Sequence, residues 1–368
     1  MFAEFYSVKQ TGIYKSLIAA ALLSLVIASI LFFSKGIPAT GPYVIATFIL
    51  LAIGSRGYET WKGYAFTISI FAAVCCSLYY PNYFISLGDF KLSGLIIPLL
   101  QIIMFGMGTA MRTDDFVTVL KDPKGVLIGI ASQFTIMPTL GFLLAKFSGL
   151  PPEIAAGIVL VGCSPSGLAS NVMAYLAKAN LALSITITSC TTLLAPFVTP
   201  VLMKYLAGAY IEINVTNMMI DISKMILVPI FAGVLFNKIF SGKIEWLEKV
   251  MPTVSMMGIA FIIVIITAAG RDSLLNIGPL LFLIVIIHNS FGYLLGYWSA
   301  RLFKMNESDA RTVAIEVGLQ NAGLASGIAK GLGKIATVGL AAGVFGPVMN
   351  ITGSMLASYW HKKEPIDK

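Results

Sequence analysis

Residues 316–321 read Glu316-Val317-Gly318-Leu319-Gln320-Asn321 and interrupt an apolar stretch that runs from about residue 308 to residue 330. A carboxylate, two amides and a glycine are costly inside a membrane helix, because hydrocarbon offers them no hydrogen-bond partner. An ionisable residue at this depth is by default a candidate functional residue. The alternative interpretation is that Glu316 forms a static ion pair with Arg311 or another base.

A second interruption, Gly162-Cys163-Ser164-Pro165-Ser166-Gly167, divides the apolar stretch of residues 153–177. Pro165 removes a backbone donor and clashes with the preceding turn. The two interruptions occupy matching positions, since GLASN at 167–171 is followed by GLASG 156 residues later. We therefore expect two broken helices, one in each half of the chain. The alternative for the first is a simple proline kink whose serines cap the freed carbonyls.

The chain around these stretches has the composition of a membrane protein. Of its 368 residues 57% are hydrophobic and 11% are charged, and the mean hydropathy is +0.88. A soluble domain carries about 25% charged residues, so a water-soluble enzyme, a nucleic-acid binder and a disordered chain are disfavoured. Long apolar runs favour helices over the short alternating segments of a barrel. The four cysteines lie inside apolar runs without a CxxC pair, which predicts buried residues rather than disulfides or metal ligands.

A helix needs about 20 apolar residues to cross a membrane, and we predict a crossing helix over twelve stretches. They are residues 16–33, 41–55, 62–80, 93–111, 124–146, 153–177, 180–204, 218–239, 250–269, 276–300, 308–330 and 335–360. No small-residue cleavage site stands behind the first stretch, so it is interpreted as a helix rather than a signal peptide.

The distribution of basic residues predicts the orientation. With the N-terminus inside, 17 Lys and Arg residues fall in inside segments and 7 in outside segments. This bias predicts a multi-pass protein of the cytoplasmic (inner) membrane with both termini cytoplasmic. The net charge of +8 then reflects topology and does not indicate nucleic acid.

The matched breaks predict an internal repeat. We expect an appended N-terminal transmembrane hairpin over residues 1–60, a first five-helix repeat over 61–208 and a second over 209–368. An odd number of helices in each repeat makes the second run through the bilayer upside down, as in secondary transporters. Gly323, Gly327 and Gly331 recur every four residues and are interpreted as helix-packing positions.

Side chains with oxygen atoms suited to a small cation lie near the breaks. Ser170 and Asn171 follow the first break, Ser184 and Thr188 share one face of the next helix, and Gln133 lies within the fifth stretch. Na⁺ needs about five or six hard oxygens, and broken helices add backbone carbonyls. Taken alone, each hydroxyl is more typical of a bond back to its own helix.

At these residues the chain resembles the bile acid:sodium symporter family. The matching segments are Phe105–Thr109, Gly167–Asn171, the pair Ser184 and Thr188, and Glu316–Asn321. The resemblance covers about residues 62–360. It implies an all-α fold of ten helices, with a core and a panel domain each formed across both repeats, in which two discontinuous helices cross near mid-membrane.

The resemblance also implies two Na⁺ sites and a cargo site. The first ion would be held by Ser170, Asn171, Ser184, Thr188 and Glu316. The second would be held by Gln133, Glu316 and Gln320 with backbone oxygens of Val317 and Leu319. The cargo would be faced by Leu168, Ala169, Asn321 and Asn350.

Three features depart from the family pattern. Leu168 stands where many bacterial members have threonine, and Met349 stands where some bile-acid-transporting members have histidine. Two predicted helices precede the family's ten. The first two departures argue against bile acid as the natural cargo and leave the sodium argument intact.

The leading functional hypothesis is sodium-coupled symport of a small organic anion, bile-acid-like, pantoate-like or a 2-oxo acid, by alternating access. The alternative is a proton-coupled organic anion carrier or a cation/proton antiporter of the same general fold, with Glu316 as the titrating group. An enzyme is disfavoured because the sequence has no HExxH or GxSxG motif. His288 and Asn289 are interpreted as buried hydrogen-bonded residues rather than a proton relay. The oligomeric state is left open.

Overall fold

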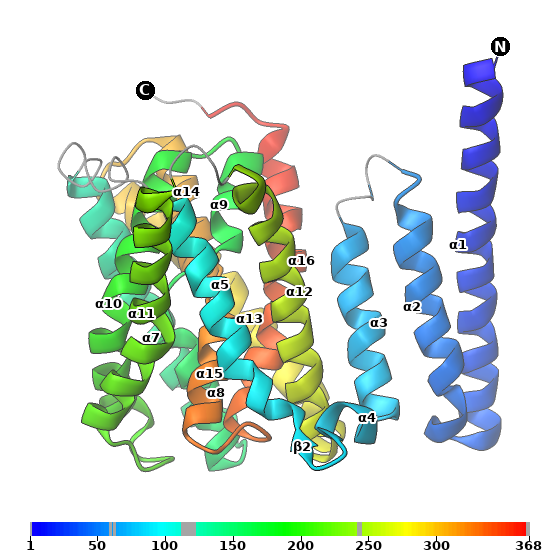
Figure 1. The fold of residues 1–368 in the computed structure, drawn as a ribbon, viewed down its shortest axis with the longest axis horizontal. Coiled ribbons are helices and arrows are strands. Elements are labelled where there is room, and N and C mark those ends of the chain that lie inside the picture. Colours follow the sequence, from blue (N-terminus) through cyan, green and yellow to red (C-terminus); the bar gives the residue numbers. More distant parts are fainter. Residues whose placement is uncertain (1, 59–60, 62–63, 112–122, 241–244, 366–368) are drawn as a thin grey trace. The chain divides into compact units, whose positions relative to one another are not determined.

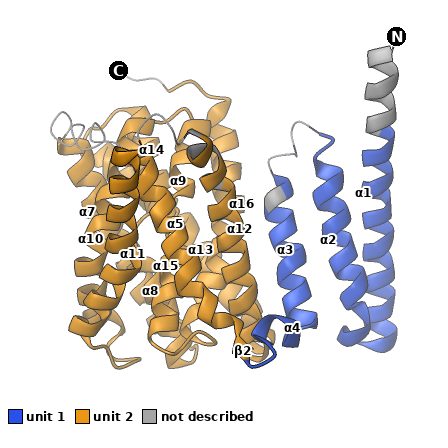
Figure 2. Ribbon diagram, in the orientation of Figure 1, with its two compact units in different colours: residues 1–89 blue, residues 90–368 orange. Residues whose placement is uncertain are grey.

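A computed structural model of the chain describes residues 2–58, 61, 64–111, 123–240 and 245–365 (Figure 1). Contacts divide the chain into unit 1, Met1–Asp89, and unit 2, Phe90–Lys368, which Figure 2 distinguishes by colour. The predicted boundary at residue 60 lies outside the described residues. So do several basic residues counted for the orientation, namely Lys62, Arg112, Lys121, Lys243 and Lys368.

Unit 1 is a helical array in which α1 packs on α2 and α2 packs on α3. Its elements are α1 (Phe2–Lys35), η1 (Ile37–Thr40), α2 (Gly41–Ser55), α3 (Ala65–Tyr79), α4 (Asn82–Ile85) and β1 (Ser86–Leu87). Polar groups join neighbouring helices, since Ser24 Oγ donates to Tyr43 O at 2.8 Å. Unit 1 includes α3, so it extends beyond the hairpin expected over residues 1–60.

Unit 2 is almost entirely helical and contains both breaks. Its elements are β2 (Phe90–Lys91), η3 (Leu92–Leu95), α5 (Ile96–Ala110), α7 (Pro123–Phe147), α8 (Pro152–Gly162), α9 (Ala169–Leu176), α10 (Leu181–Ala207), α11 (Val215–Ile239), α12 (Glu245–Ala269), α13 (Arg271–Leu302), α14 (Glu307–Gly318), α15 (Ala322–Gly331) and α16 (Val338–His361). Asparagine begins several of these helices. The side chains of Asn180, Asn214 and Asn306 accept a hydrogen bond from the first turn of α10, α11 and α14.

The fold confirms an all-α integral membrane protein. Among the described residues, eight helices are long and apolar enough to cross a membrane, and three further apolar helices are shorter. Each of the twelve predicted stretches coincides with one helix, or with two half-helices in residues 153–177 and 308–330. The inverted relation between the two five-helix repeats stays a prediction.

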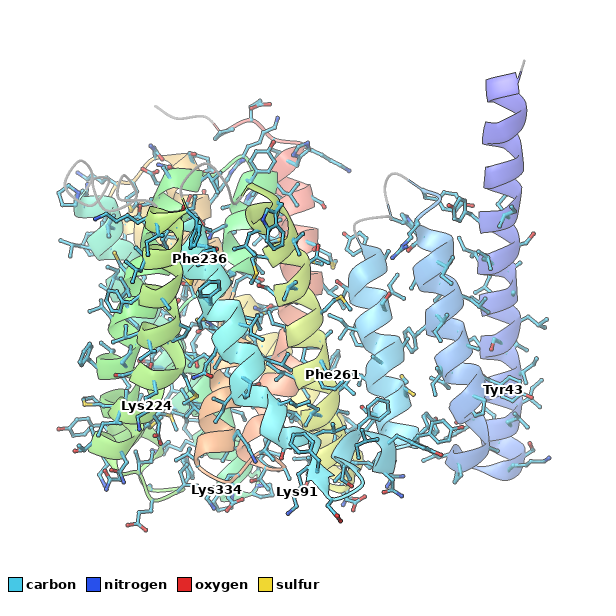
Figure 3. The ribbon with its side chains drawn as sticks, in the orientation of Figure 1. Tyr43, Lys91, Lys224, Phe236, Phe261 and Lys334 are labelled. Carbon is cyan, nitrogen blue, oxygen red and sulfur yellow. The ribbon has the colours of Figure 1, made fainter. Side chains whose placement is uncertain are left out.

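The half-helices are held by contacts between the two halves of the chain. Figure 1 shows α8 and α15 at one end of unit 2, and α9 and α14 at the other. At the first end, Glu153 of α8 accepts hydrogen bonds from Lys334 (Figure 3) and Thr337, in the turn after α15. At the other end, Asn180, in the turn after α9, donates to Asp309 of α14 at 2.8 Å. The first half of each broken helix, α8 or α14, thus anchors the turn that follows the other broken helix.

The segment Phe105–Thr109 owes its composition to close helix packing. A Cβ at Gly108 would lie 2.2 Å from the carbonyl oxygen of Ile230, so α5 and α11 approach backbone to backbone there. One turn away the rings of Phe105 and Phe236 meet edge to face at 5.6 Å; Phe236 is labelled in Figure 3. This part of the family pattern therefore serves helix packing.

Candidate functional site

The first break is a buried stretch of irregular backbone between α8 and α9. Residues 162–167 are all buried, so their polar backbone groups need partners within the protein. Those partners come from neighbouring helices. Thr199 Oγ1 of α10 donates to Cys163 O at 2.7 Å, and Gln133 Nε2 of α7 donates to Ser164 O at 2.9 Å. The break is thus an ordered, hydrogen-bonded structure rather than a kink capped only by its own serines.

The second break is built in the same way between α14 and α15. Asn289 Nδ2 of α13 donates to Gly318 O at 2.8 Å, and Gln320 Nε2 donates to Val317 O at 2.6 Å. Helix α15 then begins at Asn321, whose side chain accepts from Leu324 N at 2.9 Å. The polar side chains of Asn289, Gln320 and Asn321, which would be costly in lipid, thus stabilise the unwound segment by hydrogen bonds.

The two breaks cross and pair with each other. Ser166 and Gln320 form an antiparallel bridge. Its hydrogen bonds run from Gly167 N to Leu319 O and from Asn321 N to Pro165 O, both at 2.8 Å. Each half of the chain therefore donates one hydrogen bond to the other. The side chain of Ser166 adds a third link, because its Oγ donates to Glu316 O at 3.0 Å.

Beside this crossing, four residues from α9 and α10 gather around the carboxylate of Glu316 in α14. Ser184 Oγ contacts Glu316 Oε1 at 2.5 Å, and Thr188 Oγ1 contacts Glu316 Oε2 at 2.8 Å. The same two hydroxyls lie 2.9 and 3.3 Å from Asn171 Oδ1. Ser170 Oγ lies 3.0 Å from Thr188 Oγ1. All five residues predicted for a first ion site are brought together.

The cluster contains more oxygen contacts than protons. Five oxygen–oxygen contacts join its residues, but only the three hydroxyls carry a proton, because a carboxylate and an amide oxygen accept only. The three hydroxyl protons are therefore shared among the five contacts. Closely spaced oxygens with too few protons fit a bound cation, and hydroxyl, amide and carboxylate oxygens are ligands for a hard ion.

The residues predicted for a second ion site divide into two groups. Gln133 and Gln320 face each other, with Gln133 Nε2 donating to Gln320 Oε1 at 2.9 Å. The carbonyls of Val317 and Leu319 accept from Gln320 Nε2 and from Gly167 N. Each carbonyl retains a second lone pair for another partner. The described hydrogen bonds of the Glu316 carboxylate, by contrast, go to the first cluster.

The four residues predicted to face cargo are less closely gathered. Leu168 and Ala169 are half-buried at the start of α9, and Asn321 is 8% exposed and caps α15. Asn350 is half-buried on α16, where its Nδ2 donates to Gly346 O of the same helix at 2.9 Å. Among the described contacts, no hydrogen bond joins Asn350 to the other three.

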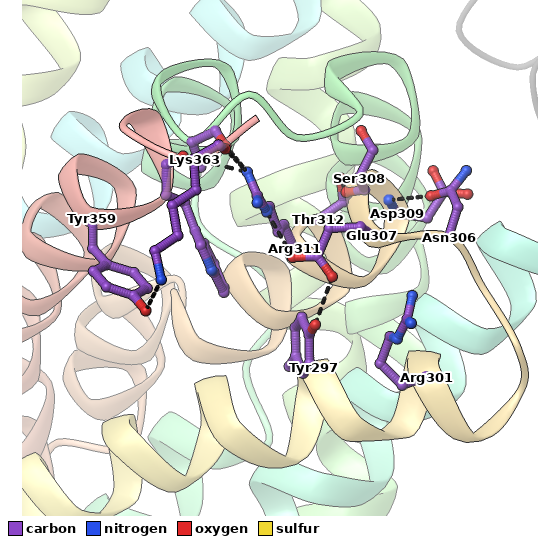
Figure 4. A network of polar contacts seen from close by, with 12 residues as sticks. Tyr297, Arg301, Asn306, Glu307, Ser308, Asp309, Arg311, Thr312, Tyr359 and Lys363 are labelled. Atoms are coloured by element: carbon purple, nitrogen blue, oxygen red, sulfur yellow. Dashed lines mark hydrogen bonds and ion pairs between the residues drawn. The ribbon is translucent and has the colours of Figure 1, made fainter. Parts of the chain in front are cut away.

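Arg311 has its own partners, about two helical turns before the end of α14 at the crossing (Figure 4). Its Nε donates to Glu307 at 2.9 Å, and its Nη1 donates to Ala177 O at 3.1 Å and to Lys363 O at 2.9 Å. The guanidinium also lies over the ring of Trp360 at 5.7 Å. Arg311 is 3% exposed. None of its described bonds reaches Glu316, so the static ion pair considered from sequence does not form.

The segment after α16 is held at the same end of unit 2. His361 Nδ1 hydrogen-bonds with Leu176 O at 2.8 Å. The exposed carboxylate of Glu364 pairs with Lys178, whose charge and hydrogen bond lower the pKa of that carboxyl. These contacts fasten the last described residues to the end of α9 and to the turn that follows it.

Sequence reasoning missed the groups that hold the crossing together. Ser164, Ser166 and Thr199 were visible as polar residues in apolar stretches, but their partners belong to distant segments. His288 and Asn289 are buried and hydrogen-bonded as expected, yet His288 pairs with Met137 O and Asn289 with Gly318 O. A polar residue opposite a predicted break is the signal that would have found Thr199 and Asn289.

The described residues thus define a multi-pass membrane protein whose two broken helices cross beside a buried carboxylate in an oxygen cluster. The sequence matches the Sodium Bile acid symporter family over residues 97–277. It is 40% identical over 309 residues to the uncharacterized sodium-dependent transporter YocS of Bacillus subtilis (strain 168), covering 84% of this chain and 94% of that protein.

Two plant proteins are also similar. The probable sodium/metabolite cotransporter BASS1, chloroplastic, of Oryza sativa subsp. japonica is 31% identical over 329 residues, covering 87% of this chain and 77% of that protein. The probable sodium/metabolite cotransporter BASS6, chloroplastic, of Arabidopsis thaliana is 31% identical over 305 residues, covering 80% and 74%. The chain belongs to the bile acid:sodium symporter family. It is therefore a member of a sodium-dependent transporter family and not an enzyme.

Proposed function

We propose that this chain couples Na⁺ to the symport of a small organic anion by alternating access across the cytoplasmic membrane, with both termini cytoplasmic. The observation that carries the proposal is the oxygen cluster around Glu316. Its carboxylate is fully buried, receives its described hydrogen bonds from hydroxyls, and forms none of the described salt bridges. A buried carboxylate without a positive partner carries a large desolvation cost, which Na⁺ would offset.

A first Na⁺ would be held by the five residues of the cluster. A second would lie on the Gln133–Gln320 side of the crossing, using free lone pairs of the Val317 and Leu319 carbonyls. Because α14 and the bridge connect the two places, binding at either stabilises the same crossed arrangement of breaks. Both ions then stabilise the same conformation of the site. If the cargo binds best to that conformation, ion binding and cargo binding are coupled.

The cargo would bind where the breaks present the N-termini of two half-helices. Backbone N–H groups and the helix dipole at such termini attract anions, and α9 and α15 both begin at the crossing. Leu168, Ala169, Asn321 and Asn350 would line this place, with Asn350 reached as the conformation changes. Leu168 offers no hydroxyl, which favours a pantoate-like or 2-oxo acid held by backbone and amide groups.

The proposal predicts that sodium stabilises the purified protein. In detergent, the melting temperature should rise saturably with NaCl and should not rise with KCl or choline chloride at equal ionic strength. A ligand at 100 times its Kd adds about 2.7 kcal/mol to stability. An anion that is cargo should raise the melting temperature further in Na⁺ and little in K⁺, since coupling is reciprocal.

Identical melting curves in Na⁺ and K⁺ would contradict the proposal. Uptake into proteoliposomes that follows a pH gradient in the absence of Na⁺ would instead support the proton-coupled carrier. The oxygen cluster favours sodium, because it gathers hydroxyl, amide and carboxylate oxygens, which are ligands for a hard cation.

Replacing Gln133 with alanine tests the second ion. Gln133→Ala removes the amide that faces Gln320 and leaves the residues around Glu316 unchanged. We expect the sodium midpoint to rise about tenfold, equivalent to roughly 1.4 kcal/mol, and the sodium response to lose cooperativity without disappearing. The measurement is the melting temperature as a function of NaCl concentration. A sodium titration with the midpoint and Hill coefficient of the wild type would exclude Gln133 from ion binding.

A further inference from the structure

The hydroxyl of Thr192 stands apart from the other buried polar groups of the protein. Among the described residues, its Oγ1 is the buried side-chain nitrogen or oxygen atom that has no hydrogen-bond partner. Thr192 lies in α10 and is fully buried. Buried polar groups are almost always paired, so an exception calls for an explanation such as a bound ion.

The backbone carbonyl of Thr192 also lacks its usual hydrogen-bond donor. An α-helical carbonyl normally accepts from the N–H four residues later. For Thr192 that position is Pro196, which has no N–H. The neighbouring residue shows the ordinary situation, since Thr191 is equally buried and its hydroxyl donates to Ile187 O at 2.8 Å. Thr192 therefore presents a hydroxyl without a partner and a carbonyl that lacks its usual i+4 donor.

Contacts on either side place Thr192 opposite the first break. One turn earlier, Thr188 contacts Ser170 and Glu316. Seven residues later, Thr199 donates to Cys163 O, where α8 ends. Residues 188, 192 and 199 share one face of an α-helix. Thr192 thus faces the unwound segment that runs from Cys163 to Ser170.

Helix α7 brings Gln133 to the same level. Gly129 of α7 lies against Ile187 of α10, because a Cβ on Gly129 would meet the Ile187 side chain at 2.3 Å. One broken helix separates α7 from α10 in the chain, so the two run in the same direction through the membrane. Gln133, one turn beyond Gly129, therefore lies at the level of residues 191 and 192. Thr192 thus lies at the level of Gln133, on the face of α10 that carries Thr188 and Thr199.

We propose that Thr192 is an additional sodium ligand, which offers its hydroxyl and the carbonyl freed by Pro196 to the ion beside Gln133 and Gln320. The inference rests on the proposed function. It gives α10 a ligand for each ion: Thr188 for the first and Thr192 for the second. Na⁺ needs about five or six oxygens, and Thr192 adds to a set otherwise made of two amides and backbone carbonyls.

The test is Thr192→Val, which keeps the shape of the side chain and removes its oxygen. The sodium midpoint of the melting temperature should rise about tenfold. In KCl the variant should melt at the same temperature as the wild type or higher, because the substitution removes a buried hydroxyl that has no partner. Thr192→Ser keeps the hydroxyl and should restore the midpoint to within about twofold of the wild type.

Thr191→Val is the matched control. This residue is next in the chain and equally buried, but its hydroxyl is bonded within α10, so its sodium midpoint should equal that of the wild type. If Thr192→Val fails to fold, Thr192→Ala carries the same expectation for the sodium midpoint.

A wild-type sodium midpoint in Thr192→Val would overturn the inference and leave the proposed function standing. A midpoint raised equally in Thr191→Val would overturn it too, because the effect would then come from packing. If the wild type itself gives no sodium response, the proposed function fails as a whole.

Discussion

Replacing Glu316 with glutamine is expected to abolish the sodium-dependent rise in melting temperature while leaving the protein inserted and folded. The amide has the size of the carboxyl group, and it can still pair with the hydroxyls of Ser184 and Thr188. The substitution removes the negative charge, however, and a cation buried without one is strongly disfavoured. The sodium affinity should fall by more than about 100-fold, or roughly 2.7 kcal/mol, as measured by melting temperature against NaCl concentration.

Glu307→Gln is the matched control for this prediction. Glu307 lies on the same half-helix as Glu316 and binds Arg311 at 2.9 Å, at the far end of α14 from the crossing. Its replacement should lower the melting temperature in both salts and leave the sodium midpoint unchanged. Glu316→Ala should reproduce the loss seen with Glu316→Gln. A normal sodium response in either Glu316 variant would refute the site, whatever the basal stability.

The fold was largely predictable because membrane helices are recognised by length and apolarity. Each predicted stretch overlaps a helix or a pair of half-helices in the structure. Both breaks were visible in the sequence as polar residues within apolar runs. Boundaries were less accurate where charged turns are helical, as in α13, which begins at Arg271 rather than residue 276. The division after Asp89 was not predictable, because it depends on which helices pack together.

The first cluster was predictable for a related reason. Its residues lie in short segments of the chain, and the i, i+4 spacing of Ser184 and Thr188 guarantees a shared helix face. What spacing could not show was where the hydroxyls point. Each taken alone is typical of a bond to its own helix, yet both contact Glu316, which is more than 120 residues away in sequence. Only the folded chain brings α10 against α14.

The family resemblance implied that the broken helices cross, but the backbone hydrogen bonds that join the two halves at the crossing were beyond sequence reasoning. A serine and a glutamine that form a bridge look the same in sequence as any other polar pair. The carbonyl partners Thr199 and Asn289 also belong to no motif. The residues proposed to bind an ion directly thus left a pattern, and the residues that hold the broken backbone in place did not.

Gly167→Val should disrupt this crossing and, with it, sodium binding. A Cβ on Gly167 would lie 2.6 Å from Gln320 O and 3.1 Å from Gln320 C, which is closer than real contacts allow. The added side chain must push the second break away and weaken the bonds from Gly167 N to Leu319 O and from Asn321 N to Pro165 O. Each such bond contributes about 1 kcal/mol, and overpacking costs about 1–3 kcal/mol more.

We expect a lower melting temperature in KCl and a raised sodium midpoint, both larger for Gly167→Val than for Gly167→Ala. Gly331→Ala is the control, because no atom lies within 4 Å of the position its Cβ would take. The two readouts should change together, since the bridge and several of the proposed ion ligands lie within residues 316–321, at the second break. A lower melting temperature with an unchanged sodium midpoint would show that the crossing supports the fold alone. Sodium binding would then depend on α10 and Glu316 and not on the backbone bridge between the breaks.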